Sequence, residues 1–408
     1  MSERVLRFAD ALEIVVEHAR EAAAAREVET VGLLDAVGRV LAERVLADRD
    51  QPPFDRATRD GFAVRAADVR EVLRVVGVVR AGEAWNGKAV DEREAVEIMT
   101  GAALPEGADA VVMVEHVVVS GKSLRVADGR TLRTGENVVA RGAEARAGVG
   151  VLRVGTVIGA AEIAVAASCG CATLPVFRKP KVAIVATGDE LVELDVAPDA
   201  TQIRNSNSYA LAAMVRVEGG EAVRVAIARD TREDVRARIA DGRKADLLVL
   251  SGGVSMGKYD LVEEVLAELG AEFFFTGALI QPGKPVVFGR LPRDGGWTYF
   301  FGLPGNPVST QVTFGLFVAP MLRGLAGREE IAPRFVEARL ADDVKGGAKV
   351  TRFLPAEMTG DWEEVTVRVV GWQGSGDVAA NARGNGYVVL PAGAADFHAG
   401  GLVRVLLR

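Results

Sequence analysis

The chain has 408 residues, of which 49% are hydrophobic and 26% are charged, and its formal net charge is -7. This length predicts a globular protein of about two to four domains. Because a nucleic-acid surface normally carries a basic excess, the acidic charge and the lack of a Lys/Arg block with interleaved aromatics argue against nucleic-acid binding. The opening MSERVLRFADALE has no apolar signal-peptide core, so we expect a cytoplasmic location.

Two alanine-rich, partly helical stretches enclose a strand-like one, which predicts a β domain inserted into a helical domain. Apolar residues recur at helical spacing over residues 8–25, and LLDAVGRVLAERV (33–45) predicts a second helix. Residues 46–145 contain valine-rich runs separated by glycine turns, among them the hairpin pattern VVVSGKSLRV. Residues 146–178 return to the alanine-rich composition, so we expect them to pack with the N-terminal helices and to form one linker domain with residues 1–45.

The apolar stretch GTVIGAAEIAVAASCGCATLPVF (155–177) is the candidate for a membrane span. It consists largely of Ala, Gly and Val and contains Glu162, whereas a spanning helix needs about 20 strongly apolar residues. We therefore expect a buried helix flanked by strands and no membrane contact. The two cysteines, Cys169 and Cys171, do not make a disulfide framework and are expected to be small buried residues, and the three histidines have no zinc-ligand spacing.

Strands and helices alternate over residues 179–326, which predicts a doubly wound parallel α/β domain. The predicted strands are KVAIVAT, EAVRVAIA, ADLLVL and the start of TYFFGLPGNP. The predicted helices are NSNSYALAAMVRVEGG, TREDVRARIADG, LVEEVLAELG and VSTQVTFGLFVAPML. Residues 327–408 contain strand patterns with glycine-rich turns, for which a small β-barrel is the simplest prediction. The expected fold class is thus an α/β multidomain protein with a helical linker, an inserted β domain and a C-terminal barrel.

Polar clusters follow several of the predicted strands, where open α/β sheets bind their ligands. TGDEL (187–191) contains Glu190, and IARDTRED contains Asp230. Carboxylates at strand ends suit Mg²⁺, which takes a few carboxylates together with water and substrate oxygens. Each residue has an alternative structural role, because an acid in TGDEL can cap the following turn and Asp230 can cap the following helix. Taken alone, neither residue is evidence of a metal site.

The stretch SGGVSMGKYD follows the strand ADLLVL and is a candidate ligand loop. Its glycines, Gly252 and Gly253 among them, allow the backbone to approach an anion, and Ser251 and Ser255 add neutral donors. Asp260 stands where either a helix cap or a metal ligand is expected. The stretch does not match the Walker A pattern, which argues against an ordinary ATPase or GTPase.

Two proline-containing turns complete the candidate site. QPGKPVVFG holds Lys284 on a stiff turn, where it is either an oxyanion partner or a solvated lysine. In LPGNPVS, Pro304 and Pro307 fix a turn before a helix whose start favours anions. If the predicted fold is right, the three carboxylates named above converge at one sheet edge and form a site for Mg²⁺ and a phosphate or another oxyanion.

In the β domain, Asp60 of RDGFAV and Thr100 of IMTGAALPEGADAVVMVE are explained equally well by turn and hairpin chemistry. The ordered set DGFAV, IMTGAALPEGADAVVMVE, TGDEL, SGGVSMGKYD, QPGKP and LPGNPVS closely resembles the molybdopterin molybdenumtransferase family. This MoeA-like family includes the C-terminal domain of gephyrin. The resemblance extends to QGSGD (373–377) and VVLP (388–391), so it covers nearly the whole chain, although SGGVSMG alone also fits the related adenylyltransferases.

The resemblance implies an enzyme that inserts molybdate into the dithiolene of adenylylated molybdopterin with Mg²⁺ and releases AMP. It also implies an elongated homodimer of four-domain subunits, with a cleft between the α/β domain of one subunit and the β domains of the other. The catalytic positions implied by the matching motifs are Asp60, Thr100 and Glu190. The implied metal ligands are Glu190, Asp230 and Asp260. The implied substrate contacts are Ser251, Gly252, Gly253, Ser255, Lys284, Pro304, Pro307 and Ser375.

The chain departs from the family pattern at three places. Gln281 replaces a lysine of many members, Glu144 replaces an aspartate, and residues 56–59 read RATR where many members have N-S-x-M. We expect Lys284 to compensate for Gln281.

Two alternatives to the insertase are a molybdopterin adenylyltransferase, for which the α/β domain alone would suffice, and a non-catalytic scaffold or cofactor carrier. Contact with a separate adenylyltransferase is a further partner hypothesis, and the sequence does not separate molybdate from tungstate.

Overall fold

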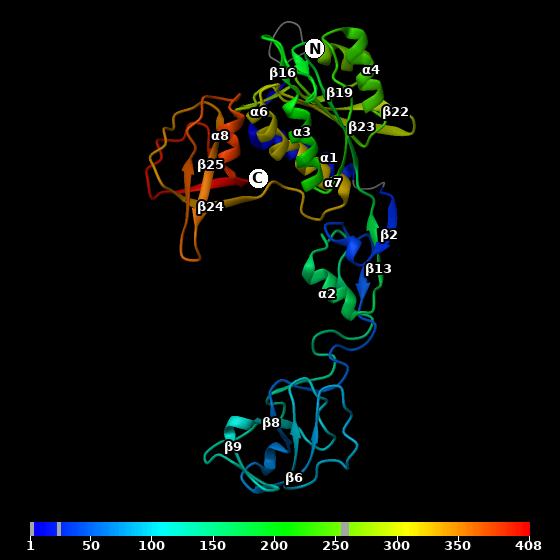
Figure 1. The fold of residues 1–408 in the computed structure, drawn as a ribbon, viewed down its shortest axis with the longest axis vertical. Helices are drawn as coiled ribbons and strands as arrows, with labels where there is room; N and C mark the ends of the chain where they lie inside the picture. Colours follow the sequence, from blue (N-terminus) through cyan, green and yellow to red (C-terminus); the bar gives the residue numbers. More distant parts are fainter. Residues whose placement is uncertain (1–3, 23–25, 254–260) are drawn as a thin grey trace.

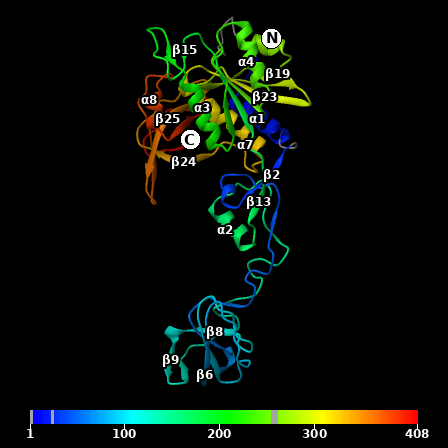
Figure 2. The ribbon, with the colours of Figure 1, turned by 45° about the vertical axis from the view of Figure 1, so that its right-hand side comes forward.

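The computed structural model describes residues 4–22, 26–253 and 261–408. The chain is elongated, with an α/β domain and a C-terminal barrel together at one end and a β-rich domain at the other (Figure 1). A slender linker that contains α2 (Ala160–Ser168) and β13 (Thr173–Phe177) joins the two ends (Figure 2). Over the described ranges, no helix combines the length and the apolar character needed to cross a membrane.

A six-stranded sheet forms the centre of the α/β domain. In spatial order its strands are β17 (Glu221–Arg224), β14 (Lys181–Ala186), β18 (Leu247–Ser251), β23 (Gly296–Leu303), β22 (Val287–Arg293) and β19 (Glu272–Phe275). The first four are parallel, which confirms the doubly wound prediction. β22 and β19 run antiparallel to their neighbours, in a stretch where the sequence predicted no strand.

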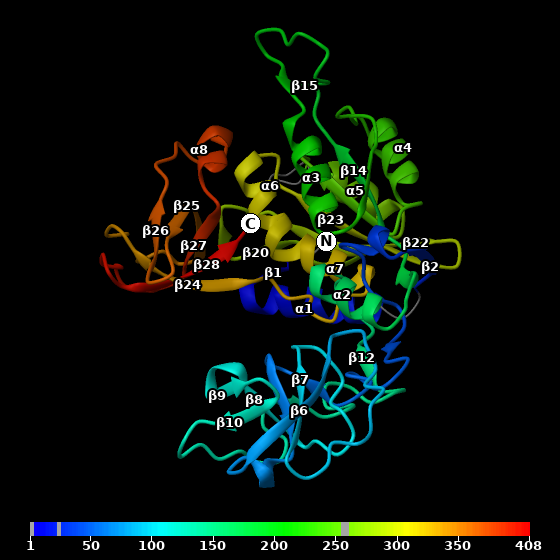
Figure 3. The ribbon, with the colours of Figure 1, turned by 60° about the horizontal axis from the view of Figure 1, so that its bottom comes forward.

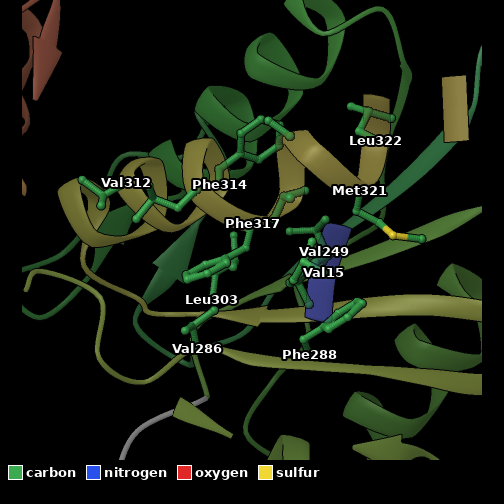
Figure 4. Close-up of a cluster of buried hydrophobic side chains, with 14 of the residues drawn as sticks. Val15, Val249, Val286, Phe288, Leu303, Val312, Phe314, Phe317, Met321 and Leu322 are labelled. Carbon is green, nitrogen blue, oxygen red and sulfur yellow. The ribbon is translucent and has the colours of Figure 1, made fainter. Parts of the chain in front are cut away.

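Helices cover both faces of this sheet because successive strand residues belong to opposite apolar clusters. In β14, Val182 and Ile184 lie in one cluster, and Ala183 and Val185 lie in the other. The helices on the first cluster are α1 (Phe8–Ala22), α3 (Ser206–Val217), α6 (Pro307–Thr313) and α7 (Ala319–Ala326). The helices on the second are α4 (Arg232–Gly242) and α5 (Leu261–Glu268). Figure 4 shows the first cluster, where side chains from the sheet and from the helices meet.

The inserted domain has its own six-stranded sheet with an apolar cluster on each face. In spatial order the strands are β8 (Ala110–Met113), β5 (Gly61–Val64), β7 (Glu94–Ile98), β6 (Val72–Val79), β10 (Ser123–Val126) and β9 (Val117–Ser120). Phe62 and Val64 of β5 belong to one cluster, and Ala63 belongs to the other. β9 and β10 pair antiparallel, which confirms the hairpin predicted around Gly121.

Segments from both sides of the insertion pair with each other in the linker. β2 (Val28–Gly32) pairs antiparallel with β13, and β3 (Val45–Leu46) pairs with β12 (Gly150–Leu152). α2 contributes to the apolar cluster of these strands, and Cys169 is buried there. The stretch 155–177 therefore forms a short helix with flanking strands, as predicted.

Two expectations for the N-terminal residues are wrong. Residues 33–45 form no α-helix: only the 3₁₀ turn Leu34–Ala36 is helical, because Gly38 has a φ of +77° and the residues that follow make β-bridges. The expected packing of residues 146–178 on α1 is also wrong, because the buried residues of α1 belong to the α/β core; residues 146–178 pack instead with residues 33–45, the other N-terminal stretch that was expected to contact them. The predicted domain boundaries themselves stay predictions.

The C-terminal domain contains the predicted barrel. Its five strands are, in order, β25 (Thr351–Gly360), β26 (Val365–Val369), β24 (Phe335–Leu340), β28 (Leu402–Leu407) and β27 (Gly386–Leu390), and pairing of β27 with β25 closes it. The short strand β21 (Ile280–Gln281) pairs with β25 from outside. Phe353, Tyr387 and Leu406 of the barrel belong to the α/β core cluster, so the two domains share buried surface.

Candidate active site

A cleft of about 950 Å³ opens at the carboxyl ends of β14, β18 and β23. This is the edge at which open α/β sheets bind ligands. α3, α6 and α8 (Val378–Arg383) begin around it, below the projection that carries β15 (Leu191–Val192) and β16 (Ile203–Arg204) (Figure 3). The predicted site residues among its described lining are Glu190, Asp230, Ser251, Gly252, Gly253 and Pro307.

The loops after β14 and β18 lie close together because two of their residues lack a side chain. Gly252 has a φ of +93°, and a Cβ at this position would lie 2.7 Å from the carbonyl oxygen of Thr187. Gly253 has a φ of +64°, and a Cβ there would lie 2.6 Å from a methyl group of Val262. Both the backbone conformation and the lack of space require glycine here. The two glycines therefore set the shape of this wall of the cleft.

We expect Gly252→Ala to destabilise the α/β domain by about 2–4 kcal/mol, from the left-handed conformation and from the clash with a neighbouring backbone. The matched control is Gly347→Ala, since Gly347 has a φ of +74° with nothing within 4 Å of the added Cβ. That control is expected to cost about 1–2 kcal/mol. Hydrogen exchange of the strand amides in the α/β domain and in the barrel measures the stability that each variant loses. Equal losses would show that the contact with Thr187 does not constrain the loop.

Glu190 and Asp230 supply the carboxylates of the described cleft lining. The Glu190 carboxylate lies over Gly188, where a Cβ would be 2.4 Å from one of its oxygens. Asp230 does not cap α4: the N-cap is Thr231, whose hydroxyl accepts the Asp234 amide at 3.3 Å. The capping alternative for Asp230 is therefore wrong, and Asp230 belongs to the cleft lining.

Hydrogen bonds hold the Asp230 side chain and the backbone that carries Glu190. Asp189 Oδ1 accepts the Asp230 amide at 3.2 Å, and Asp230 Oδ2 accepts the Asp189 amide at 3.3 Å. The Arg229 guanidinium donates to the carbonyls of Asp189 and Leu191, each at 3.1 Å. Two carboxylates held in this way suit Mg²⁺, which completes its coordination with water and substrate oxygens. Within the described ranges no group of three or more His, Cys, Asp or Glu side chains could hold a metal, and Asp260 lies outside those ranges.

Asn207 is a cleft residue that the sequence analysis treated only as part of a helix cap. Its side-chain amide donates to the Gly305 carbonyl at 2.7 Å and to the Ser251 hydroxyl at 3.0 Å. The cap of α3 is Asn205, whose side chain accepts the Ser208 amide at 3.2 Å. Asn207 thus joins the loops after β18 and β23. The N-S-N pattern does not show which asparagine caps the helix, because asparagine at either position favours a helix start.

The LPGNP loop connects the cleft to the barrel. The Asn306 side-chain amide donates to the Ser375 hydroxyl at 2.9 Å, and the Val308 amide donates to the Ser375 carbonyl at 3.0 Å. Pro307 occupies the first turn of α6, where its missing N–H costs no hydrogen bond. Pro304 is buried directly after β23. The predicted barrel residue therefore contacts the loop that forms one wall of the cleft.

The remaining predicted substrate contacts do not appear in the described lining. Lys284 is half-buried in the connection between β21 and β22 and is not among the lining residues. The adjacent Gly283 packs against α6, where a Cβ would lie 2.5 Å from the Thr313 methyl group. Ser255, like Asp260, lies outside the described residues. The roles of these three residues stay predictions.

Asp60 and Thr100 lie in the inserted domain, which stands apart from the α/β domain of the same chain (Figure 1). Asp60 Oδ1 accepts the Thr100 amide at 2.6 Å and the Thr100 hydroxyl at 2.8 Å. These bonds, the backbone one first, hold the pKa of the Asp60 carboxyl below its ordinary value of 3.8. Both residues are exposed, so this turn presents a fixed, ionised carboxylate to solvent.

We expect Thr100→Val to raise the pKa of Asp60 while leaving it below 3.8, because the backbone bond remains. Since the folded pKa is lowered, the pairing stabilises the fold above the unfolded pKa, and this contribution is lost as pH falls through the folded pKa. The variant should therefore lose less stability on acidification. Carboxyl titration by NMR measures the shift, and an unchanged Asp60 pKa would show that the hydroxyl makes no such bond.

Three family models match the chain in order. They are the MoeA N-terminal region (domain I and II) over residues 6–170, a probable molybdopterin binding domain over residues 183–324, and the MoeA C-terminal region (domain IV) over residues 337–407. The strand-end loops of the cleft lie in the second match, and Ser375 lies in the third.

Similar whole proteins are also known. A molybdopterin molybdenumtransferase of Staphylococcus aureus (strain COL) is 35% identical over 389 residues, which are 93% of this chain and 90% of that protein. One from Staphylococcus epidermidis is 34% identical over 388 residues, 92% of this chain and 90% of that protein. Two crystal structures of a molybdopterin biosynthesis MoeA protein from Pyrococcus horikoshii have TM-scores of 0.74 and 0.80, with 33% and 28% identity. They cover 99% of this chain and 99% and 100% of their own.

Proposed function

The chain belongs to the MoeA family of molybdopterin molybdenumtransferases, and on that premise we propose that it inserts molybdenum during molybdenum cofactor biosynthesis. In this reaction molybdate enters the dithiolene of adenylylated molybdopterin, and AMP is released. The observation that carries the proposal is the cleft, where three strand-end loops and two carboxylates meet within the segment matched by a probable molybdopterin binding domain.

The substrates are oxyanions, and the glycine loop and the proline loop are suited to them. Ser251 offers a hydroxyl, and Gly252 and Gly253 allow a close approach of the backbone. Pro307 lies at the start of α6, where the helix dipole favours an anion. Ser375 and Lys284 add a hydroxyl and a positive charge if they reach the bound substrate. Support for these roles comes from the donor types and from the motif resemblance.

Glu190 and Asp230, together with Asp260, would hold Mg²⁺. The fit rests on two carboxylates in the cleft lining: the Asp189 amide holds that of Asp230, and the backbone that carries Glu190 is anchored by Arg229. The chemistry that Mg²⁺ supplies when bound is polarisation of the phosphoanhydride and neutralisation of the charge that develops on AMP. The carboxylates would keep the metal at the sheet edge, next to the glycine loop.

Asp60 and Thr100 would act on the substrate of a second subunit in a homodimer. In support, their turn is exposed, and the inserted domain stands apart from the α/β domain that carries the cleft of its own chain (Figure 2). A dimer in which this domain reaches the partner's cleft would add an ionised carboxylate there. Equilibrium sedimentation of the full chain tests the dimer.

The activity test uses the purified full chain with adenylylated molybdopterin, molybdate and Mg²⁺. We expect AMP release that depends on molybdate and Mg²⁺, together with active molybdenum cofactor. A folded dimer that releases no AMP would defeat the insertase assignment. ATP-dependent formation of adenylylated molybdopterin would instead support the adenylyltransferase alternative, and binding of the pterin without turnover would support the carrier or scaffold. Replacing molybdate by tungstate in the same assay determines the choice of metal.

A further inference from the structure

The described lining of the cleft contains one arginine, Arg204. Among the described lining residues, the charged side chains are Glu190, Asp230 and Arg204. Molybdate and a phosphoanhydride are both anions, and two carboxylates alone would repel them. Lys284 lies outside the described lining, and residue 281 is an uncharged glutamine. Arg204 is therefore the cation that the described cleft offers to an anionic ligand.

The main chain fixes Arg204 to the strand that follows Glu190. β15 and β16 pair in parallel, and Arg204 is the last residue of β16. The amide before it, of Ile203, donates to the Glu190 carbonyl at 2.8 Å, and the amide after it, of Asn205, donates to the Val192 carbonyl at 2.9 Å. The guanidinium therefore extends from a backbone that is anchored on both sides.

The side chain of Arg204 is not engaged elsewhere in the described part of the chain. It is exposed and makes no hydrogen bond or ion pair with a described residue. The two nearby arginines differ: Arg224 pairs with Glu193 at 2.6 Å, and Arg229 donates to the carbonyls of the turn that carries Glu190. Arg224 and Arg229 thus stabilise the fold, whereas Arg204 keeps its donors for a ligand.

Two further features of the cleft lining favour an anionic ligand. The first turn of α3 begins two residues after Arg204, and Ser206 and Asn207 of that turn line the cleft, so the positive end of a 12-residue helix faces it. Thr187 also lines the cleft and is only 4% exposed, and its hydroxyl has no partner among the described residues. A buried hydroxyl without a partner indicates a ligand atom or water in the functional state.

We propose that Arg204 binds a phosphate oxygen of adenylylated molybdopterin, an inference that rests on the proposed insertase function. The planar guanidinium matches phosphate with two parallel hydrogen bonds, which a lysine cannot make. The carboxylates beside it suit Mg²⁺, which in proteins usually binds substrate phosphates. The phosphate would then lie beside Arg204 and the two carboxylates, which all belong to the lining of one cleft.

The test compares Arg204→Ala and Arg204→Lys with wild type, and Arg216→Ala is the matched control. Arg216 is an exposed arginine of α3 that does not line the cleft. In the AMP-release assay, adenylylated molybdopterin and molybdate are varied separately. A second readout is the Kd for AMP alone, measured by calorimetry with Mg²⁺. Loss of a charge-assisted hydrogen bond predicts that Arg204→Ala raises the KM for the pterin substrate and the Kd for AMP about 10–100-fold.

Arg204→Lys should recover part of this affinity, and the KM for molybdate should not change in any variant. An unchanged pterin KM and AMP Kd in an active Arg204→Ala enzyme would overturn the proposal and leave the insertase assignment intact. A rise in the molybdate KM alone would also overturn it, because Arg204 would then bind the other anion. Failure of the insertase assignment itself is separate, since wild type would then release no AMP.

Discussion

Glu190→Gln and Asp230→Asn are each expected to lower kcat for AMP release about 10²–10³-fold. Each change removes one negative charge while keeping the size of the side chain. Both carboxylates are exposed in the cleft, so folding should be unaffected, and the loss arises from weaker binding of Mg²⁺ beside the phosphoanhydride. Single-turnover AMP release at several Mg²⁺ concentrations measures kcat and the midpoint for Mg²⁺, which should rise in both variants.

The matched control is Glu233→Gln, which makes the same chemical change on the neighbouring helix. Glu233 is exposed in the first turn of α4 and does not line the cleft. It should keep the wild-type rate and the wild-type Mg²⁺ midpoint. If Glu190→Gln and Asp230→Asn behave like this control, the two carboxylates are not part of the catalytic site, and the acidic wall has only a structural role.

The fold was predictable where hydrophobic periodicity dominates. The alternation of buried strands and amphipathic helices over residues 179–326 predicted the α/β sheet, because each strand must bury both faces. Residues 33–45 show the limit of this reasoning, since helical spacing of apolar residues does not reveal that Gly38 adopts a positive φ and that β-bridges follow. The packing of α1 on the α/β domain was equally hidden, because an apolar helix face does not specify its partner.

The site was predictable as a set of strand-end motifs and not as a set of contacts. The sequence left Asp230 as either a helix cap or a metal ligand, and only the geometry shows that Thr231 caps α4 while Asp230 lines the cleft. Asn207 and Arg204 were missed because a single asparagine in a cap pattern and a single arginine before a helix are common. Both residues line the cleft where the chain leaves β14, β18 and β23. These strand ends meet because of the order of the strands in the sheet, which local sequence does not reveal.

Phe317→Ala is expected to destabilise the chain by about 3–5 kcal/mol, the usual cost of emptying a large aromatic site in a core. Phe317 is fully buried in the π-helical segment Phe314–Val318 (Figure 4). Its ring centroid lies 5.8 Å from that of Phe275 in the sheet and 6.2 Å from that of Phe8 in α1. Phe8 in turn lies 5.3 Å from Phe353 of the barrel. This aromatic series therefore joins the sheet, the N-terminal helix and the barrel.

The loss of stability should also weaken the contact between the barrel and the cleft, because the barrel holds Ser375 against the LPGNP loop. We expect hydrogen exchange of the Val308 amide, which donates to the Ser375 carbonyl, to accelerate in Phe317→Ala along with global unfolding in urea. Phe317→Leu keeps most of the volume and should cost less than about 1.5 kcal/mol. Trp362→Ala, at a side chain that is 90% exposed, should change stability by no more than about 0.5 kcal/mol. A destabilised Phe317→Ala with unchanged exchange at Val308 would mean that the barrel is held to the cleft by its loop contacts and not by the shared aromatic core.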